Sequence, residues 1–193
     1  MRKSNFSIIK CELSALLACI FFASCASTSR LNKVYVTNSN KVDLLPTDAI
    51  SREIDEYQYF DGEFGGNSFS ALLYLQADKN EINILLLNDF GIEAGSIFYD
   101  GKTAHLESDF FPKNLKCEYI ILDLQNAYAD FAALKSHYKK YKIDFEESSA
   151  PEKTVRKIIK NSKVIEEIRI EKDKITIENY LRNYKYVLTK AEP

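Results

Sequence analysis

The clearest chemical signal in the chain is a cysteine near its start. Ala23-Ser24-Cys25 follow an apolar run over residues 13–22, and Arg2, Lys3 and Lys10 give that run a positive flank. A run of about ten apolar residues is too short to cross a bilayer and is typical of the h-region of a secretory signal. Two small residues before a cysteine are typical of the bacterial lipobox, in which the thiol receives a diacylglycerol and becomes the mature N-terminus. We therefore expect a lipoprotein signal peptide over residues 1–24 and lipid attachment at Cys25; an ordinary cleaved signal or a retained anchor is the alternative.

The other cysteines carry no comparable signal. The chain has four cysteines, and Cys11 and Cys19 would leave with the signal peptide. Only Cys117 would then remain beside Cys25, so we expect no internal disulfide. Cys117 stands among apolar residues, which favours a packed small hydrophobic side chain over a reactive thiol.

Composition limits the domain organisation and the partners. We expect a lipidated flexible tether over residues 25–50, which are rich in Ser, Thr and Asn, and one folded domain over residues 51–193. The formal net charge of the chain is −2, and removal of the basic signal peptide makes the rest more acidic. Because nucleic-acid affinity comes largely from phosphate neutralisation, we expect no nucleic-acid partner. Nothing in the sequence indicates an oligomeric state.

The residue types of catalytic and metal sites are sparse. The chain has two histidines, His105 and His137, and no HExxH motif, glycine-flanked serine or phosphate-cradling glycine loop. No His/Cys cluster has the spacing of metal ligands. We therefore expect a protein that is not an enzyme and has no metal and no cofactor, although a triad assembled from distant residues stays open.

Period-two alternation predicts most of the folded domain to be strands. Apolar and polar residues alternate over residues 54–59, 69–77, 82–87, 92–99 and 102–108, and again over 168–171, 175–178 and 184–189. Turns are predicted at residues 78–81 and at Asp100-Gly101. The connections are too short for crossover helices, so the strands should form antiparallel meanders. Residues 146–153, which contain Pro151, are expected to be a polar loop.

Between the two groups of strands the period changes. Apolar residues from Cys117 to Tyr138 recur at steps of three and four, which predicts one amphipathic helix or two consecutive helices. Asp123, Gln125, Asn126 and Asp130 are expected on the polar face. The predicted fold class is α+β, mainly β: a curved antiparallel sheet that forms an open half-barrel, with a helical lid inserted between the two groups of strands.

Short motifs along residues 54–188 support this fold. They are Asp78-Lys79-Asn80-Glu81, Phe90-Gly91, Ile97 to Gly101, Phe111-Pro112, Tyr119 to Tyr128 and Leu181 to Tyr184. With them the chain resembles an uncharacterised family of small bacterial lipoproteins, some encoded beside aryl-polyene synthesis genes. That family is in turn similar to the LolA/LolB-like lipoprotein carriers. The family pattern has Trp-Pro where this chain has Ala129-Asp130, and the chain has no tryptophan.

The resemblance implies an apolar cavity between sheet and helix that accepts a lipid, an acyl chain or a lipoprotein. The candidate ligand-lining residues are Phe69, Leu73, Leu75, Ile84, Leu86, Phe98, Ile120, Ile121, Leu124 and Phe131. From the alternation itself, the same residues could instead fill a closed core, so both interpretations stay open. In the alternative function, a non-catalytic lipoprotein with a filled core docks a protein of the cell envelope.

Two further features bear on the membrane. The run His137 to Lys142 could contact anionic lipid headgroups, but cations that complement a helix C-terminus are the favoured interpretation. Ala26, rather than Asp, follows the lipidated cysteine. By the sorting habit of enterobacterial-type lipoproteins, this predicts an outer-membrane protein that faces the periplasm.

Overall fold

The computed structural model describes residues 33–64, 66–88, 90–108 and 116–192. These belong to one compact unit that spans residues 31–193. Cys25 and the expected signal peptide lie outside the described residues, as does Phe111-Pro112. Signal cleavage and lipid attachment therefore stay predictions.

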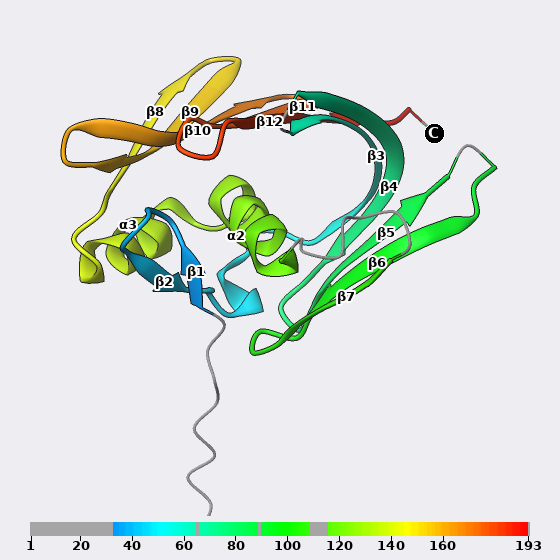
Figure 1. Ribbon diagram of the computed structural model, residues 1–193, viewed down its shortest axis with the longest axis horizontal. Coiled ribbons are helices and arrows are strands. Elements are labelled where there is room, and N and C mark those ends of the chain that lie inside the picture. The colour runs from blue at the N-terminus through cyan, green and yellow to red at the C-terminus, as the bar shows by residue number, and fades with distance from the viewer. Residues whose placement is uncertain (1–32, 65, 89, 109–115, 193) are drawn as a thin grey trace, which may run out of the picture. The chain divides into compact units, whose positions relative to one another are not determined.

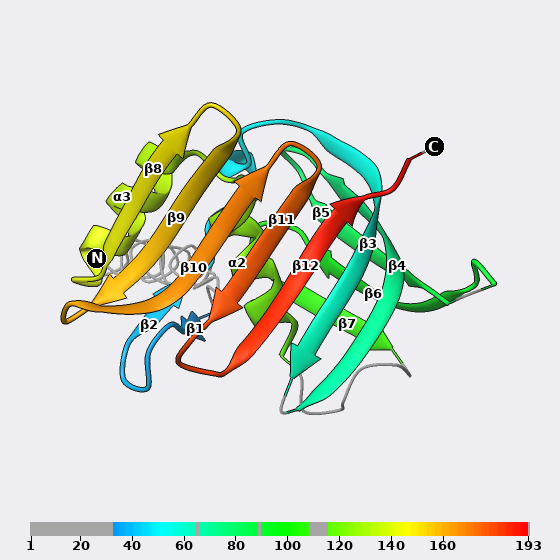
Figure 2. The ribbon, with the colours of Figure 1, turned by 90° about the horizontal axis from the view of Figure 1, so that it is seen from above.

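One large antiparallel sheet dominates the described residues (Figure 2). Its strands are β3 (Ile54–Phe64), β4 (Asn67–Ala77), β5 (Ile82–Leu87), β6 (Glu93–Tyr99), β7 (Ala104–Ser108), β8 (Asp144–Ala150), β9 (Lys153–Lys160), β10 (Lys163–Glu171), β11 (Lys174–Asn179) and β12 (Tyr184–Lys190). The strand order is β7-β6-β5-β4-β3-β12-β11-β10-β9-β8. It joins two meanders, because β12, the last strand in the chain, pairs with β3, the first strand of this sheet in the chain, with Tyr186 opposite Gly62. The sheet does not close, which confirms the expected open architecture.

Both predicted turns form, but the connection at Asp100-Gly101 is longer than predicted and runs over residues 100–103, because β6 ends at Tyr99 and its partner Ala104 begins β7. The Asp78 carboxylate accepts hydrogen bonds from the backbone N–H groups of Asn80 (2.7 Å) and Glu81 (3.0 Å). At the β6–β7 turn, Asp100 accepts from the N–H of Lys102 at 2.8 Å, and Gly101 has a φ of 84°. Such side-chain caps and a glycine in the left-handed region are the chemistry of tight turns.

The polar loop expected over residues 146–153 is wrong, because β8 and β9 form a hairpin there. Their pairing runs from Asp144 opposite Ile159 to Ala150 opposite Lys153, and Pro151 lies in the connecting turn. β8 is at the edge of the sheet and its last residues are exposed on both faces. A strand with so little burial has no apolar alternation from which it could be predicted.

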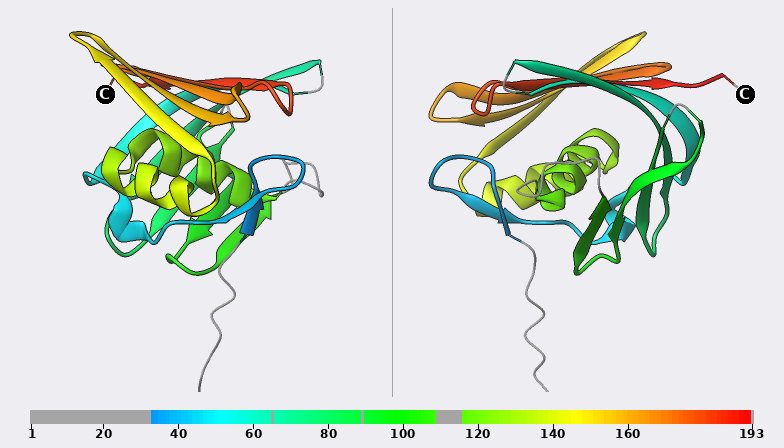
Figure 3. Two further views of the ribbon diagram at one scale, coloured as in Figure 1. Left: turned by 90° about the vertical axis from the view of Figure 1, so that its left-hand side faces the viewer. Right: turned by 45° about the vertical axis from the view of Figure 1, so that its right-hand side comes forward.

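The helical segment consists of two helices, α2 (Cys117–Tyr128) and α3 (Phe131–Lys140). Asp130 separates them, because its side chain accepts a hydrogen bond from Ala133 N at 2.9 Å and caps α3. Figure 1 shows that the sheet arches over α2, and both views of Figure 3 agree. No helix among the described residues combines the length and the apolar character needed to cross a membrane.

Helix α2 has no solvent-facing polar side, contrary to the amphipathic expectation. Asp123, Gln125 and Asn126 are 3%, 1% and 0% exposed. The sheet covers one side of the helix, and the N-terminal segment covers another. Gln125 joins that segment, since its side chain accepts a hydrogen bond from Leu45 N (2.9 Å) and donates one to Leu45 O (2.6 Å).

The N-terminal segment is folded, so the flexible tether expected over residues 25–50 is wrong for residues 33–50. It contains β1 (Lys33–Tyr35), β2 (Lys41–Asp43) and the 3₁₀ turn η1 (Thr47–Ala49). Val34, Val42 and Leu44 are at most 2% exposed and belong to the core. Residues 33–50 are therefore part of the folded unit, because their apolar side chains cover α2. Residues 25–32 of the expected tether lie outside the described residues.

Candidate functional site

An apolar cavity of about 640 Å³ lies between the inner face of the sheet and α2. This volume is within the range of roughly 300–1,000 Å³ that small-molecule sites occupy. The lining residues are Gln58, Phe60, Phe64, Asn67, Phe69, Leu73, Leu75, Ile84, Leu86, Ile97, Lys116, Tyr119, Ile120, Asp123, Leu124, Arg182, Tyr184, Tyr186 and Leu188. Most of them are apolar or aromatic, and the charged groups among them are few.

Strand register creates the aliphatic part of the lining. Alternation along β4 turns Leu73 and Leu75 to the same face. The pairing of β4 with β5 then sets Leu73 opposite Leu86 and Leu75 opposite Ile84. On β6, Ile97 continues the row opposite Ile84. Three neighbouring strands thus present one continuous aliphatic surface to the cavity.

Aromatic rings form the part of the wall that β3, β4 and β12 contribute. The ring of Phe60 lies 5.2 Å from that of Phe69 and 5.3 Å from that of Tyr186, measured between centroids. Phe64 stacks on Tyr184 at 5.0 Å. Aromatic pairs at such distances are favourable, and rings have few rotatable bonds. The wall therefore consists of stiff side chains that support one another.

Helix α2 supplies the opposite wall. Ile120 and Leu124 are four residues apart and hence lie on one face, with Asp123 beside them. The carboxyl of Asp123 accepts hydrogen bonds from the hydroxyls of Tyr184 (2.7 Å) and Tyr186 (3.1 Å). The inner surface of the cavity therefore has one polar cluster in otherwise apolar surroundings.

Asp123 forms a buried acid pair with Glu166 on β10. The two carboxyls are hydrogen-bonded to each other, and Glu166 also accepts from Asn179 Nδ2 at 2.8 Å. Burial raises the pKa of Asp123 well above its ordinary value of 3.8, and the charge of Glu166 adds to the rise. Burial also raises the pKa of Glu166. Two buried carboxyls cannot both be charged at low cost, so this arrangement favours a form in which one of them carries a proton.

Two cations line the cavity where α2 begins. Lys116 is the exposed N-cap residue of α2. Arg182 lies in the β11–β12 turn, with its guanidinium carbon 4.8 Å from the ring centroid of Tyr119. Its Nη2 donates to the backbone oxygen of Tyr35 at 2.6 Å. This end of the cavity is therefore positively charged.

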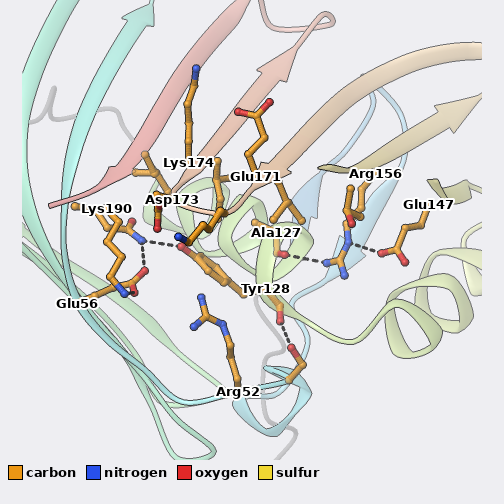
Figure 4. Close-up of a pocket in the computed structure, with 17 residues that line it drawn as sticks. Arg52, Glu56, Ala127, Tyr128, Glu147, Arg156, Glu171, Asp173, Lys174 and Lys190 are labelled. Carbon is orange, nitrogen blue, oxygen red and sulfur yellow. Dashed lines mark hydrogen bonds and ion pairs between the residues drawn. The ribbon is translucent and has the colours of Figure 1, made fainter. Parts of the chain in front are cut away.

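A smaller, polar pocket of about 370 Å³ lies at the other end of α2 (Figure 4). Lys190 Nζ is 3.1 Å from the Glu56 carboxylate, and Arg156 Nε is 2.8 Å from that of Glu147. Arg52 points toward the ring of Tyr128, 5.9 Å from its centroid. These two ion pairs engage Glu56, Lys190, Glu147 and Arg156 with other side chains of the pocket lining.

Gln58 and Leu188 line both the cavity and the polar pocket. Gln58 Nε2 donates to the Tyr128 hydroxyl at 2.8 Å and to Glu56 Oε1 at 2.7 Å. Along the inner face of β3 the side chains therefore change from carboxylate at Glu56 to amide at Gln58 and to aromatic ring at Phe60. The Gln58 side chain closes the apolar cavity on its polar side.

Most of the residues predicted to line a cavity do so. Those at the lining are Phe69, Leu73, Leu75, Ile84, Leu86, Ile120 and Leu124. Their contact with a ligand stays a prediction. The alternation was consistent with either an apolar cavity or a closed core. At this position the structure has a cavity.

Three predicted residues lie elsewhere. Phe98 is 36% exposed, because alternation on β6 turns its neighbours Ile97 and Tyr99 inward instead. Ile121 is 0% exposed and packs in the hydrophobic core without lining the cavity. Phe131 is on α3, where its ring lies 6.0 Å from that of Phe145.

Apart from Phe69, the aromatic wall was not predicted. Phe60, Phe64, Tyr184 and Tyr186 line the cavity from β3 and β12. Phe60 and Phe64 share the parity of the buried Ile54, which was a usable signal. The tyrosines of β12 share one face with the buried Leu188, but that alternation did not show that they meet Phe60 and Phe64, because this follows from the long-range pairing of β12 with β3.

The remaining candidate residues are away from the cavity. Cys117 is buried, and this burial raises its pKa to about 11, which confirms a packed thiol. His105 is exposed on β7. His137 is in the last turn of α3 with Lys139 and Lys140, as the favoured interpretation of that run requires. Within the described residues no group of His, Cys, Asp and Glu side chains gathers as a metal site.

Comparison with known proteins identifies a family. The model of a family described as "Protein of unknown function (DUF3261)" matches residues 56–192, more than half of the chain. The chain is also similar to the solved structure of a DUF1329 family protein from Desulfovibrio piger ATCC 29098, with 8% sequence identity and a TM-score of 0.27. The match covers 76% of this chain and 87% of that chain. No curated protein matches.

Proposed function

The chain belongs to the DUF3261 family of proteins of unknown function, and we propose that it is a membrane-anchored lipoprotein whose cavity binds an acyl chain. The ligand is a lipid or the acyl part of a lipoprotein, and the role is non-catalytic handling of such molecules in the cell envelope. The observation that carries this proposal is the apolar cavity of about 640 Å³ beneath the sheet. A large, mainly apolar concave site with few polar groups suits a hydrocarbon ligand.

The dimensions of the cavity support a long chain. Its lining residues on β4 run from Asn67 to Leu75, which is roughly 26 Å of strand at about 3.3 Å per residue. Burying about fourteen methylene groups would contribute roughly 11 kcal/mol at about 0.8 kcal/mol each. Association costs at least about 4 kcal/mol. The net gain is then at most about 7 kcal/mol, so a dissociation constant of the order of 10 µM or weaker is expected.

Cys25 is the proposed anchor, and it lies in the sequence Ala23-Ser24-Cys25-Ala26. We propose a diacylglycerol on its thiol and an outer-membrane location that faces the periplasm. The implied association with aryl-polyene synthesis likewise stays a proposal. Radiolabelled palmitate should label the wild-type chain in a bacterial host but not Cys25→Ala. Equal labelling of both chains would contradict the anchor.

Ligand binding is tested on the purified full chain. Native mass spectrometry should detect co-purifying lipid, and a fluorescent fatty acid should bind saturably. Leu124→Arg should abolish uptake while the far-ultraviolet circular dichroism of the sheet is kept, because it places a charge on the cavity wall of α2. Wild-type affinity in this variant would show that the cavity is not the binding site.

Strand β5 offers a matched pair of variants. Leu86 faces the cavity and is 2% exposed, whereas Leu85 is on the other face of the same strand. Leu86→Trp should fill the cavity and weaken uptake, and Leu85→Trp should bind like the wild type. The alternative function, non-catalytic docking of an envelope protein, would be favoured if neither lipid nor fatty acid binds in the cavity.

A further inference from the structure

The polar groups of the cavity are distributed unevenly. Lys116 and Arg182 line it where α2 begins. Near them, β3 ends at Phe64 and β4 begins at Asn67, which is opposite Phe64 in the sheet. The far end of the lining is formed by Gln58, which bonds to residues of the polar pocket. The cavity therefore has one cationic end and one end closed by an amide.

The two cations lack acidic partners among the described residues. Lys116 and Arg182 are in none of the ion pairs there, which join other residues. The hydrogen bonds of Arg182 go to neutral acceptors, the backbone oxygens of Tyr35 and Val36 and the hydroxyl of Tyr119. These acceptors hold the guanidinium in place without cancelling its charge.

Asp123, the carboxyl among the lining residues, does not neutralise the charges of Lys116 and Arg182. Asp123 is 3% exposed and is engaged by Tyr184, Tyr186 and the partner carboxyl of Glu166. Burial raises its pKa, which favours the neutral form of this carboxyl. Long apolar walls that lead to two cations without an acidic partner in the described part of the chain are complementary to a molecule with a hydrocarbon tail and an anionic head.

We propose that the ligand of this cavity is an anionic amphiphile, whose carboxylate or phosphate head group lies between Lys116 and Arg182 while its chain extends along α2 toward Gln58. This inference rests on the proposed function, and it adds the class and the orientation of the ligand. An anion here gains two charge-assisted interactions in a partly exposed site.

The test compares amphiphiles of equal chain length on the purified full chain. Palmitate and hexadecyl phosphate should bind about fivefold to tenfold more tightly than hexadecanol, and hexadecyltrimethylammonium should bind most weakly. Higher salt should reduce the advantage of the anions. Equal affinity for the four probes, or tightest binding of the ammonium probe, would overturn the anionic head group while leaving the proposed function intact. Failure of all four probes to bind would instead refute the proposed function.

Variants locate the head group. Lys116→Gln should weaken palmitate about threefold to fivefold, Lys116→Glu should weaken it more, and both should leave hexadecanol unchanged. Lys102→Gln, in the exposed β6–β7 turn, is the matched control and should have no effect. Arg182→Gln should act like Lys116→Gln, but Arg182 also binds the backbone of β1, so the Lys116 variants are the decisive ones. Equal loss of palmitate and hexadecanol in those variants would refute the placement.

Discussion

Replacing Arg156 with methionine should loosen the junction between α2 and α3. Arg156 extends from β9, and its Nη1 lies 2.9 Å from the backbone oxygen of Asn126, 3.0 Å from that of Ala127 and 2.9 Å from that of Ala129. Its Nε bonds to Glu147 at 2.8 Å. The last carbonyls of a helix have no partner within the helix. Arg156 therefore satisfies the C-terminal end of α2 and fastens the helix to the sheet, as Figure 4 shows for its bonds to Ala127 and Glu147.

The expected cost follows from these contacts. One Nη1 has two hydrogens for three acceptors, so about two full hydrogen bonds are lost, each worth roughly 1.5–3 kcal/mol when the donor is charged. The Arg156 side chain is 11% exposed. Because the junction borders the polar pocket, water can replace part of what is lost. We expect the free energy of unfolding to fall by about 2–4 kcal/mol.

Urea unfolding, followed by circular dichroism, measures this loss. The slope of the free energy of unfolding against urea concentration should be the same in the wild type and the variant, which shows that they unfold in the same way. Arg169→Met is the matched control, since Arg169 is on the neighbouring strand β10 and pairs only with the side chains of Glu167 and Glu178 in the described part of the chain. A cross-strand ion pair of this kind is worth about 1 kcal/mol or less. If Arg156→Met costs no more than Arg169→Met, Arg156 does not hold the helix.

Two further predictions concern the cavity walls. Burial raises the pKa of Asp123 in the folded state. Its contribution to stability is therefore complete below the unfolded pKa, near 3.8, and is lost as pH rises from there through the folded pKa. Asp123→Asn should flatten this fall when the free energy of unfolding is measured against pH, and a wild-type slope in the variant would contradict the assignment. Gly62→Ala should destabilise the fold by about 1–3 kcal/mol, because the added Cβ would lie 2.7 Å from Cζ of Phe69. The double variant Gly62→Ala/Phe69→Leu should recover most of that loss, and additive losses would show that the ring is not the cause.

Local patterns were sufficient for the elements whose formation depends on near neighbours. The strands β4 to β6 were predicted from alternation and from the Asp78 and Asp100 turns, because a hairpin needs only a suitable turn and a partner next in the chain. Leu73, Leu75, Ile84 and Leu86 were placed on the cavity side for the same reason. Phe98 was also placed there, wrongly, since alternation alone cannot say which of two apolar neighbours faces inward.

Other features depend on which segment, often distant in the sequence, packs against a given element. β8 is too polar to be recognised without its partner β9, and the pairing of β12 with β3, which brings Tyr184 and Tyr186 to the cavity, joins the two ends of the sheet. Asp123 is polar in the sequence yet buried in the fold, because both the sheet and the segment over residues 33–50 cover α2.

The sequence by itself determined an antiparallel, mainly β chain with a helical insert and a candidate lipidation site at Cys25. Only the tertiary structure decided that the apolar surfaces enclose a hollow, that the hollow ends at Lys116 and Arg182, and that the carboxyl of Asp123 on its wall is coupled to that of Glu166. The physical reason is that periodicity reports which side of an element avoids water, whereas a cavity depends on how closely two such sides approach.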